Sequence, residues 1–116
     1  MLSKVFALMS RHPHIISYKE VFIDEESQTL CLVVEYADDG DLLQRVARAE
    51  DEKVPIPEEE VWNVVLSLTK ALQILHSKKI LHRDLKSANV FLFKDGTVKL
   101  GDMNVSKVAK KDLLYT

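Results

Sequence analysis

The sequence predicts an α+β fold in one small domain. Short runs rich in β-branched and aromatic residues occur as two pairs, and a long segment with helical periodicity lies between the pairs. A chain of 116 residues with 47% hydrophobic and 29% charged residues has the length and composition of a single globular domain.

The first pair of strands is expected at residues 15–23 (IISYKEVFI) and 29–36 (TLCLVVEY). The polar residues 24–28 between them favour an antiparallel pairing. Ahead of this pair, the apolar positions within residues 2–10 indicate the last turns of a helix that ends near His12 and Pro13.

Two helices are expected in the middle of the chain. Asp41 is a predicted N-cap for a short amphipathic helix within ADDGDLLQRVARAE, and the charged, proline-containing residues 50–57 are expected to form a linker. The long helix is expected to begin near Pro57 or Glu58, because three glutamates in succession suit the positive end of the helix dipole. Its polar strip is narrow and includes Ser67, which predicts neighbours around most of the helix. The predicted apolar stripe is Val61, Val64, Val65, Leu68, Ala71, Leu72 and Leu75.

The second pair of strands is expected at residues 90–93 and 98–100, joined by KDGT, in which the Asp-Gly pair is a strong tight-turn signal. The residues after this hairpin are polar and are expected to be irregular. A hairpin brings the residues at its two open ends together, so Asp84 and Asn89 are expected to lie close to Asp102.

Such a cluster would be rich in oxygen. Carboxylate and amide oxygens are the ligands that Mg²⁺ prefers, and a carboxylate without a metal could accept a proton from a hydroxyl. Lys86 could neutralise a phosphoryl oxygen at the same place. The spacing alone fits a second interpretation equally well, in which Asp84 forms an Asx-turn and Asn89 caps a solvated loop.

Several classes of function are disfavoured by the bulk properties. A net charge of −2 provides no basic field, so neither nucleic acid nor an anionic membrane surface is an expected partner. Cys31 is the single cysteine and can form no internal disulfide, and no apolar run approaches the length of a membrane span.

His12 and His14 flank a proline, and we interpret them as a turn between helix and strand rather than as a metal site.

Four stretches of the sequence resemble one known family. HRDLKSAN at 82–89 is similar to the catalytic loop of protein kinases, His-Arg-Asp-Leu-x-x-x-Asn, at every specified position, and GDMN at 101–104 stands where kinases carry Asp-Phe-Gly. HPHIISYKEVFIDEE, EYADDGDL and LHRDLKSANVFL together resemble the NIMA-related (NEK) serine/threonine kinases. The resemblance covers essentially the whole chain.

The resemblance implies a partial protein-kinase fold. Residues 1–36 would be a remnant of the N-lobe, comprising the end of the C-helix, two strands and the start of the hinge. Residues 37–116 would be the hinge and the first part of the C-lobe, ending in the activation segment. The three glycines lie apart at 40, 96 and 101 and form no glycine-rich loop, and no strand with a phosphate-anchoring lysine is recognisable. We therefore expect these 116 residues by themselves to be inactive.

The activity implied by the resemblance is transfer of the γ-phosphoryl group of ATP to serine or threonine hydroxyls of protein substrates, with ATP and Mg²⁺ as cofactors. Asp84 would orient the substrate hydroxyl and accept its proton, and Lys86 would contact the γ-phosphate. Asn89 and Asp102 would hold the magnesium ions. A pseudokinase-like interaction module without turnover is the alternative.

The same resemblance assigns a nucleotide pocket, with Val34 as the gatekeeper, backbone groups of Glu35 and Ala37 facing adenine, and Phe91 as the floor. His82 would be a scaffold residue, and Arg83 would pair with a phosphate on the activation segment. No signal peptide is evident, so a cytosolic or nuclear protein is expected. We take the cytoplasmic interpretation, to which the resemblance adds a cytoskeletal association, and the oligomeric state stays unknown.

One departure from the family pattern is the replacement of Asp-Phe-Gly by Asp-Met-Asn. Met103 is flexible enough to fill a gap of the size of phenylalanine. Asn104 is the non-glycine residue that most readily adopts a left-handed backbone. We therefore interpret the change as a tolerated variant.

Overall fold

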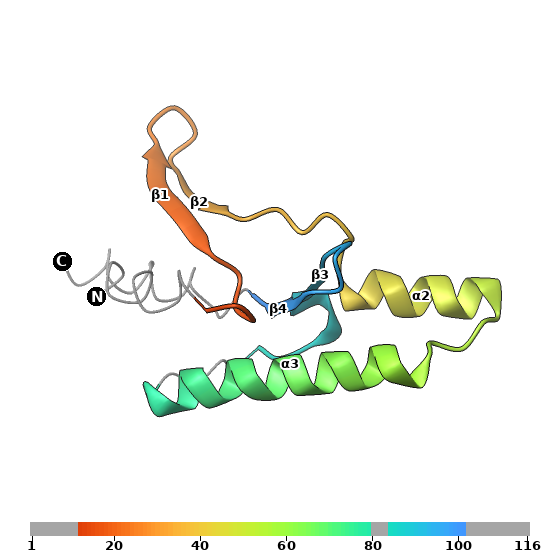
Figure 1. Cartoon of the computed structure of the whole chain (residues 1–116). Coiled ribbons are helices and arrows are strands. Elements are labelled where there is room, and N and C mark those ends of the chain that lie inside the picture. Colours follow the sequence, from red (N-terminus) through yellow and green to blue (C-terminus); the bar gives the residue numbers. More distant parts are fainter. Residues whose placement is uncertain (1–11, 80–83, 102–116) are drawn as a thin grey trace.

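The computed structural model of the chain describes residues 12–79 and 84–101 (Figure 1). Helices are combined with two separate two-stranded sheets, one formed by β1 and β2 and the other by β3 and β4, which confirms the predicted α+β class. The elements in chain order are β1 (Tyr18–Asp24), β2 (Thr29–Val34), α2 (Leu42–Glu52), α3 (Glu58–Ser77), the short 3-10 helix η1 (Ser87–Asn89), β3 (Val90–Leu92) and β4 (Val98–Leu100).

Strands β1 and β2 form the antiparallel hairpin that the sequence predicts. The carboxylate of Asp24 closes its turn by accepting hydrogen bonds from the Glu26 N–H at 3.2 Å and the Ser27 hydroxyl at 2.9 Å. β1 begins at Tyr18 rather than at the predicted residue 15, because residues 14–16 pair with a different strand.

That different strand is β4, and the pairing joins the two sheets. Ile15 forms a parallel bridge with Leu100. The Ile16 N–H donates to the Leu100 carbonyl at 2.9 Å, and the Leu100 N–H donates to the His14 carbonyl at 2.8 Å. Ile15 and Leu100 are 1% and 0% exposed, so this junction lies in the core.

Helix α2 begins where the sequence predicts. The carboxylate of Asp41 accepts a hydrogen bond from the Gln44 N–H at 2.9 Å, which confirms the N-cap. The helix ends at Glu52, three residues into the predicted linker, and Lys53 terminates it in a left-handed conformation with φ of 56°. The short segment 53–57 then leads into α3 (Figure 1).

Helix α3 confirms the predicted long helix, but its buried face is rotated from the predicted stripe. Ala71 and Leu75 of the predicted stripe are buried, but Val61 and Val65 are 45% and 44% exposed. Ser67, from the predicted polar strip, is only 3% exposed. The small side chains of Ser67 and Ala71 allow the β3–β4 hairpin to approach closely, and the Asn63 amide donates to the Gly96 carbonyl at 2.8 Å. Within the described ranges, neighbours therefore cover one side of this helix and not most of its circumference.

The core lies where α3 meets the hairpin of β3 and β4. A fully buried large apolar side chain contributes about 1.5–3 kcal/mol to folding, so this cluster is the main stabilising feature of the described structure. Its members are Ile15, Tyr18, Ala71, Leu75, Val90, Leu92, Val98 and Leu100.

Two predicted segments lie outside the described residues, namely the helix within 2–10 and the irregular region after Gly101. Of the helices that the structure describes, none combines the length and the apolar character needed to cross a lipid bilayer.

Replacing Ala71 by leucine is expected to destabilise the protein by about 1–3 kcal/mol, because the added carbons enter a packed core. Urea denaturation of the intact protein measures the change. Val65→Leu, on the exposed side of the same helix, is the matched control and should change the free energy of unfolding by less than about 0.5 kcal/mol. Equal unfolding midpoints for the two variants would contradict the described packing of α3.

Candidate active site

Asn89 organises the polar loop ahead of β3. It is the last residue of η1 and only 4% exposed. Its side-chain nitrogen donates to the Asp84 carbonyl at 2.8 Å and to Asp84 Oδ2 at 3.2 Å. One buried amide thus holds both the backbone and the carboxylate of Asp84. With Nδ2 directed at Asp84, Oδ1 is the atom of Asn89 that has the lone pairs to ligate a cation.

Lys86 lies on the same side of the loop as Asp84. Its ammonium is 3.8 Å from Asp84 Oδ2, and the two side chains are 58% and 35% exposed. An ion pair this long and this exposed contributes little to stability. The Lys86 ammonium and the Asp84 carboxylate are therefore both accessible to a ligand. The Asn89 N–H donates to the Lys86 carbonyl at 3.0 Å and closes the turn.

Three side chains are predicted to lie close together, and the structure describes two of them, Asp84 and Asn89, in contact with each other. Asp102 lies outside the described residues, as do His82 and Arg83. Its neighbour Gly101 is described, and the Gly101 N–H donates to the Asn89 carbonyl at 2.9 Å. The chain that leads to position 102 is therefore held beside the polar loop.

A hollow of about 330 Å³ is lined in part by Phe91 of β3, the strand that directly follows this loop. The four residues that the resemblance assigns to nucleotide binding, Val34, Glu35, Ala37 and Phe91, all line it. A mostly apolar hollow with a few polar groups is the usual form of a small-molecule site. The sequence analysis did not assign the other lining residues, which are Ile16, Tyr36, Gly40, Asp41 and Gln44.

Backbone pairing attaches the segment that follows β2 to β3. The Asp39 N–H donates to the Leu92 carbonyl at 3.1 Å, and the Leu92 N–H donates to the Gly40 carbonyl at 2.9 Å. Asp38 Oδ1 accepts a hydrogen bond from the Lys94 N–H at 2.9 Å. Gly40 has a φ of 72°, a left-handed conformation that glycine adopts at no steric cost. One wall of the hollow is therefore held against the strand that carries its floor.

A second glycine allows close packing below the floor. A Cβ atom at Gly101 would lie 2.6 Å from Cε2 of Phe91, closer than real Cβ contacts allow. Glycine at this position lets the chain pass directly under the Phe91 ring. It thereby links the hollow to the segment that continues toward Asp102.

Glu35 carries an ion pair that the sequence analysis missed. Its Oε1 and Oε2 accept hydrogen bonds from Lys99 Nζ at 2.8 and 3.0 Å, and Oε1 also accepts one from the Ser17 N–H at 2.9 Å. Partial burial by itself raises the pKa of the Glu35 carboxyl, but the hydrogen bonds from Lys99 and Ser17 outweigh it and lower the pKa below its ordinary value. Strand alternation predicts only that Lys99 lies on the face opposite Val98 and Leu100. No local pattern in the sequence indicates its pairing with Glu35.

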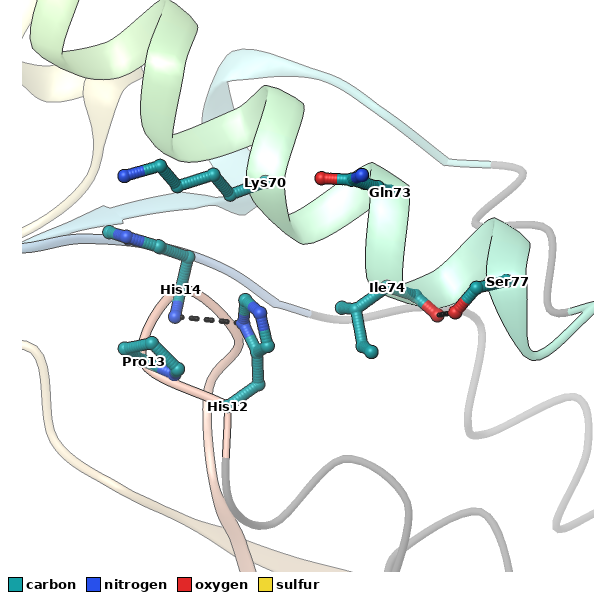
Figure 2. A pocket seen from close by; sticks show the side chains of 7 residues that line it. All are labelled: His12, Pro13, His14, Lys70, Gln73, Ile74 and Ser77. Atoms are coloured by element: carbon teal, nitrogen blue, oxygen red, sulfur yellow. Dashed lines mark hydrogen bonds between the residues drawn. The ribbon is translucent and has the colours of Figure 1, made fainter.

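His12 and His14 line a different hollow, of about 390 Å³, against the C-terminal half of α3 (Figure 2). His12 Nδ1 accepts a hydrogen bond from the His14 N–H at 3.1 Å, and His14 Nδ1 donates to the Val98 carbonyl at 3.0 Å. Burial, and after it the charge of His14, lower the pKa of His12. One nitrogen of each ring is thus engaged with backbone, which agrees with the predicted turn. No group of three or more His, Cys, Asp or Glu side chains suited to a metal is present in the described residues.

Comparison with known proteins identifies the family. Residues 3–116 match the protein kinase domain family. The chain is 41% identical over 98 residues to the serine/threonine-protein kinase Nek1 of Mus musculus, with 84% of this chain and 8% of that protein covered. It is 38% identical over 110 residues to Nek2 of Mus musculus, with 90% and 25% covered, and 35% identical over 106 residues to the probable serine/threonine-protein kinase nek2 of Dictyostelium discoideum, with 89% and 25% covered.

The chain belongs to the protein kinase domain family. The resemblance to the NIMA-related kinases is also confirmed, since these relatives are 35–41% identical over most of the chain. The chain spans between 8% and 25% of the length of these relatives. Protein kinases as a family use ATP and Mg²⁺.

The lowered pKa of Glu35 predicts a pH-dependent contribution to stability. A carboxyl group whose pKa is lower in the folded state stabilises the fold above its unfolded pKa, and this contribution is lost as the pH falls through the folded pKa. At neutral pH, Glu35→Gln is expected to cost about 1.5–3 kcal/mol, the range for hydrogen bonds to charged groups.

Urea denaturation of wild type and Glu35→Gln between neutral pH and about pH 3 checks this prediction. The difference in unfolding free energy should be constant down to about pH 5 and should then shrink. A difference that persisted unchanged at the lowest pH would contradict the ionised pairing of Glu35 with Lys99.

Proposed function

We propose that this chain is part of the catalytic domain of a serine/threonine protein kinase that transfers the γ-phosphoryl group of ATP to hydroxyl groups of protein substrates. One observation carries the proposal: the buried amide of Asn89 holds the Asp84 carboxylate at the open end of the β3–β4 hairpin. The mostly apolar lining of the hollow over Phe91 supports the proposal that a nucleotide base binds there.

Asp84 would receive the substrate hydroxyl and accept its proton. The carboxylate is partly exposed, so a hydroxyl can reach it, while the hydrogen bonds from Asn89 hold its orientation. A positioned base of this kind contributes about 10²–10⁴-fold to a rate. Lys86 would contact the γ-phosphate, because its ammonium lies beside Asp84 and is accessible.

The nucleotide would lie between the segment after β2 and the ring of Phe91. Val34 and Ala37 provide apolar wall, and the backbone groups of Glu35 and Ala37 would recognise the edge of the adenine. This hollow fits a flat ring that is apolar on its faces and polar at its edge.

The oxygen donors of the loop fit magnesium. Asn89 Oδ1 is a hard oxygen ligand, and Asp102 would provide a carboxylate directly after Gly101. Bound Mg²⁺ would neutralise charge on the ATP phosphates. The residues of this chain would supply its ligands and keep Asn89 oriented through the hydrogen bonds to Asp84.

We also propose that residues 1–36 correspond to part of the N-lobe with the start of the hinge, and residues 37–116 to the hinge and first part of the C-lobe. The two separate sheets in these two segments support this division. We also propose a cytoplasmic location, with the cytoskeletal association that the resemblance to the NIMA-related kinases implies. A fluorescent fusion of the intact protein, co-stained for microtubules, tests the location.

A pseudokinase-like interaction module was the alternative, and no observation favours it. Asp84, Lys86 and Asn89 are all present and lie together in one loop.

Asp84→Asn in the intact protein is expected to lower kcat by about 10²–10⁴-fold, because the amide cannot accept the proton of the hydroxyl. ATP affinity should remain largely intact, since Asp84 does not line the nucleotide hollow. Transfer of radiolabelled phosphate to a serine/threonine peptide and a separate nucleotide-binding titration measure the two effects. Asp51→Asn, an equal charge change on the exposed side of α2, is the control. Normal turnover by Asp84→Asn would remove Asp84 from the proposed role.

A further inference from the structure

We infer that Glu35 and Lys99 are positioning residues for the proposed nucleotide site, and that their ion pair sets the spacing between the backbone of residues 35–37 and the ring of Phe91. The inference rests on the proposed function and deepens it. Neither side chain is assigned to contact the reacting groups. Glu35 acts by holding the backbone segment that lines the hollow, and Lys99 acts through the strand pair that carries Phe91.

The ion pair is short and largely removed from water. Lys99 Nζ lies 2.8 and 3.0 Å from the two carboxylate oxygens of Glu35, and the side chains are 18% and 19% exposed. Water therefore screens this pair less than an exposed one. The geometry restrains the distance between the two backbones that carry it.

Glu35 is also tied to the start of β1. The Ser17 N–H donates to Glu35 Oε1 at 2.9 Å, and the Glu35 N–H donates to the Ser17 carbonyl at 3.0 Å. These reciprocal bonds hold both the side chain and the backbone of Glu35. A displacement of its carboxylate would therefore move the backbone of this segment, which lines the hollow.

Lys99 is attached to the floor of the hollow. It pairs directly with Phe91 across the β3–β4 ladder, so the two side chains leave the same face of the sheet. The Lys99 ammonium also lies 5.1 Å from the centre of the Phe93 ring, a cation–π contact. The ion pair thus connects the face that carries the floor to the segment that forms the wall.

This connection matters because the wall follows β2 of one sheet, whereas the floor belongs to the other sheet. β2 pairs with β1, and β3 pairs with β4, without a shared ladder between the two sheets. Backbone hydrogen bonds set how the two sheets lie relative to each other. They join residues 14–16 to Leu100 and residues 39–40 to Leu92. The ion pair adds a side-chain link where the hollow lies between the sheets.

The test measures nucleotide recognition separately from chemistry in the intact protein. Lys99→Met removes the charge and keeps the length of the side chain, and Glu35→Gln removes the opposite charge. Each variant is expected to raise the KM for ATP and the Kd for a fluorescent ATP analogue roughly tenfold, with kcat within about threefold of wild type. The double variant should be no worse than either single variant, because both remove the same interaction.

Two further variants separate positioning from stability alone. Lys99→Arg keeps the charge and should retain a KM for ATP close to that of wild type. Arg45→Met breaks the bidentate ion pair with Glu60, which joins α2 to α3 through two 2.9 Å hydrogen bonds. It should lower the thermal unfolding midpoint without a change in the KM for ATP.

Each outcome decides a different point. If the intact kinase, of which this chain is proposed to be part, neither binds ATP nor transfers phosphate in its wild-type form, the proposed function fails. If wild type does both and Lys99→Met and Glu35→Gln leave KM and Kd unchanged, the positioning role is overturned while the proposed function stands. If both variants unfold, or if Arg45→Met raises KM equally, the pair is a stabilising contact only and the inference is rejected.

Discussion

The described structure depends on one backbone junction, the pairing of residues 14–16 with Leu100. Its two hydrogen bonds, of 2.8 and 2.9 Å, join the β1–β2 hairpin to β4. Each such bond adds about 0.5–1.5 kcal/mol, and the burial of Ile15 and Leu100 adds about 1.5–3 kcal/mol for each side chain. Without this junction, the β1–β2 hairpin would lose its backbone hydrogen bonds to β4, and the wall of the hollow would be held less firmly against its floor.

The β3–β4 hairpin serves both the core and the site. One of its faces packs Val90, Leu92 and Val98 into the core that α3 completes. Its alternate residues Phe91 and Lys99 contribute to the hollow and to the ion pair with Glu35. Because successive side chains of a strand point to opposite faces, one short hairpin can perform both tasks.

Polar groups are used differently in the two parts of the site. At the loop, the buried Asn89 amide orients Asp84, while Asp84 and Lys86 remain accessible. At the hollow, Glu35 and Lys99 are paired with each other and partly buried, and we infer that they support the shape of the site. This division agrees with a chemistry that depends on positioning and electrostatics more than on covalent steps.

Within the described residues, the sequence by itself determined helices α2 and α3, the two strand pairs, the Asp41 cap and the residue types of the polar loop, because these follow from local propensity, capping and motif spacing. Only the tertiary structure decided that α3 buries Ser67 and exposes Val61 and Val65, because this depends on how closely the β3–β4 hairpin approaches the helix. It likewise decided the pairing of Glu35 with Lys99, whose positions are 64 residues apart. No local pattern relates such distant positions, because their contact depends on how two separate sheets are brought together.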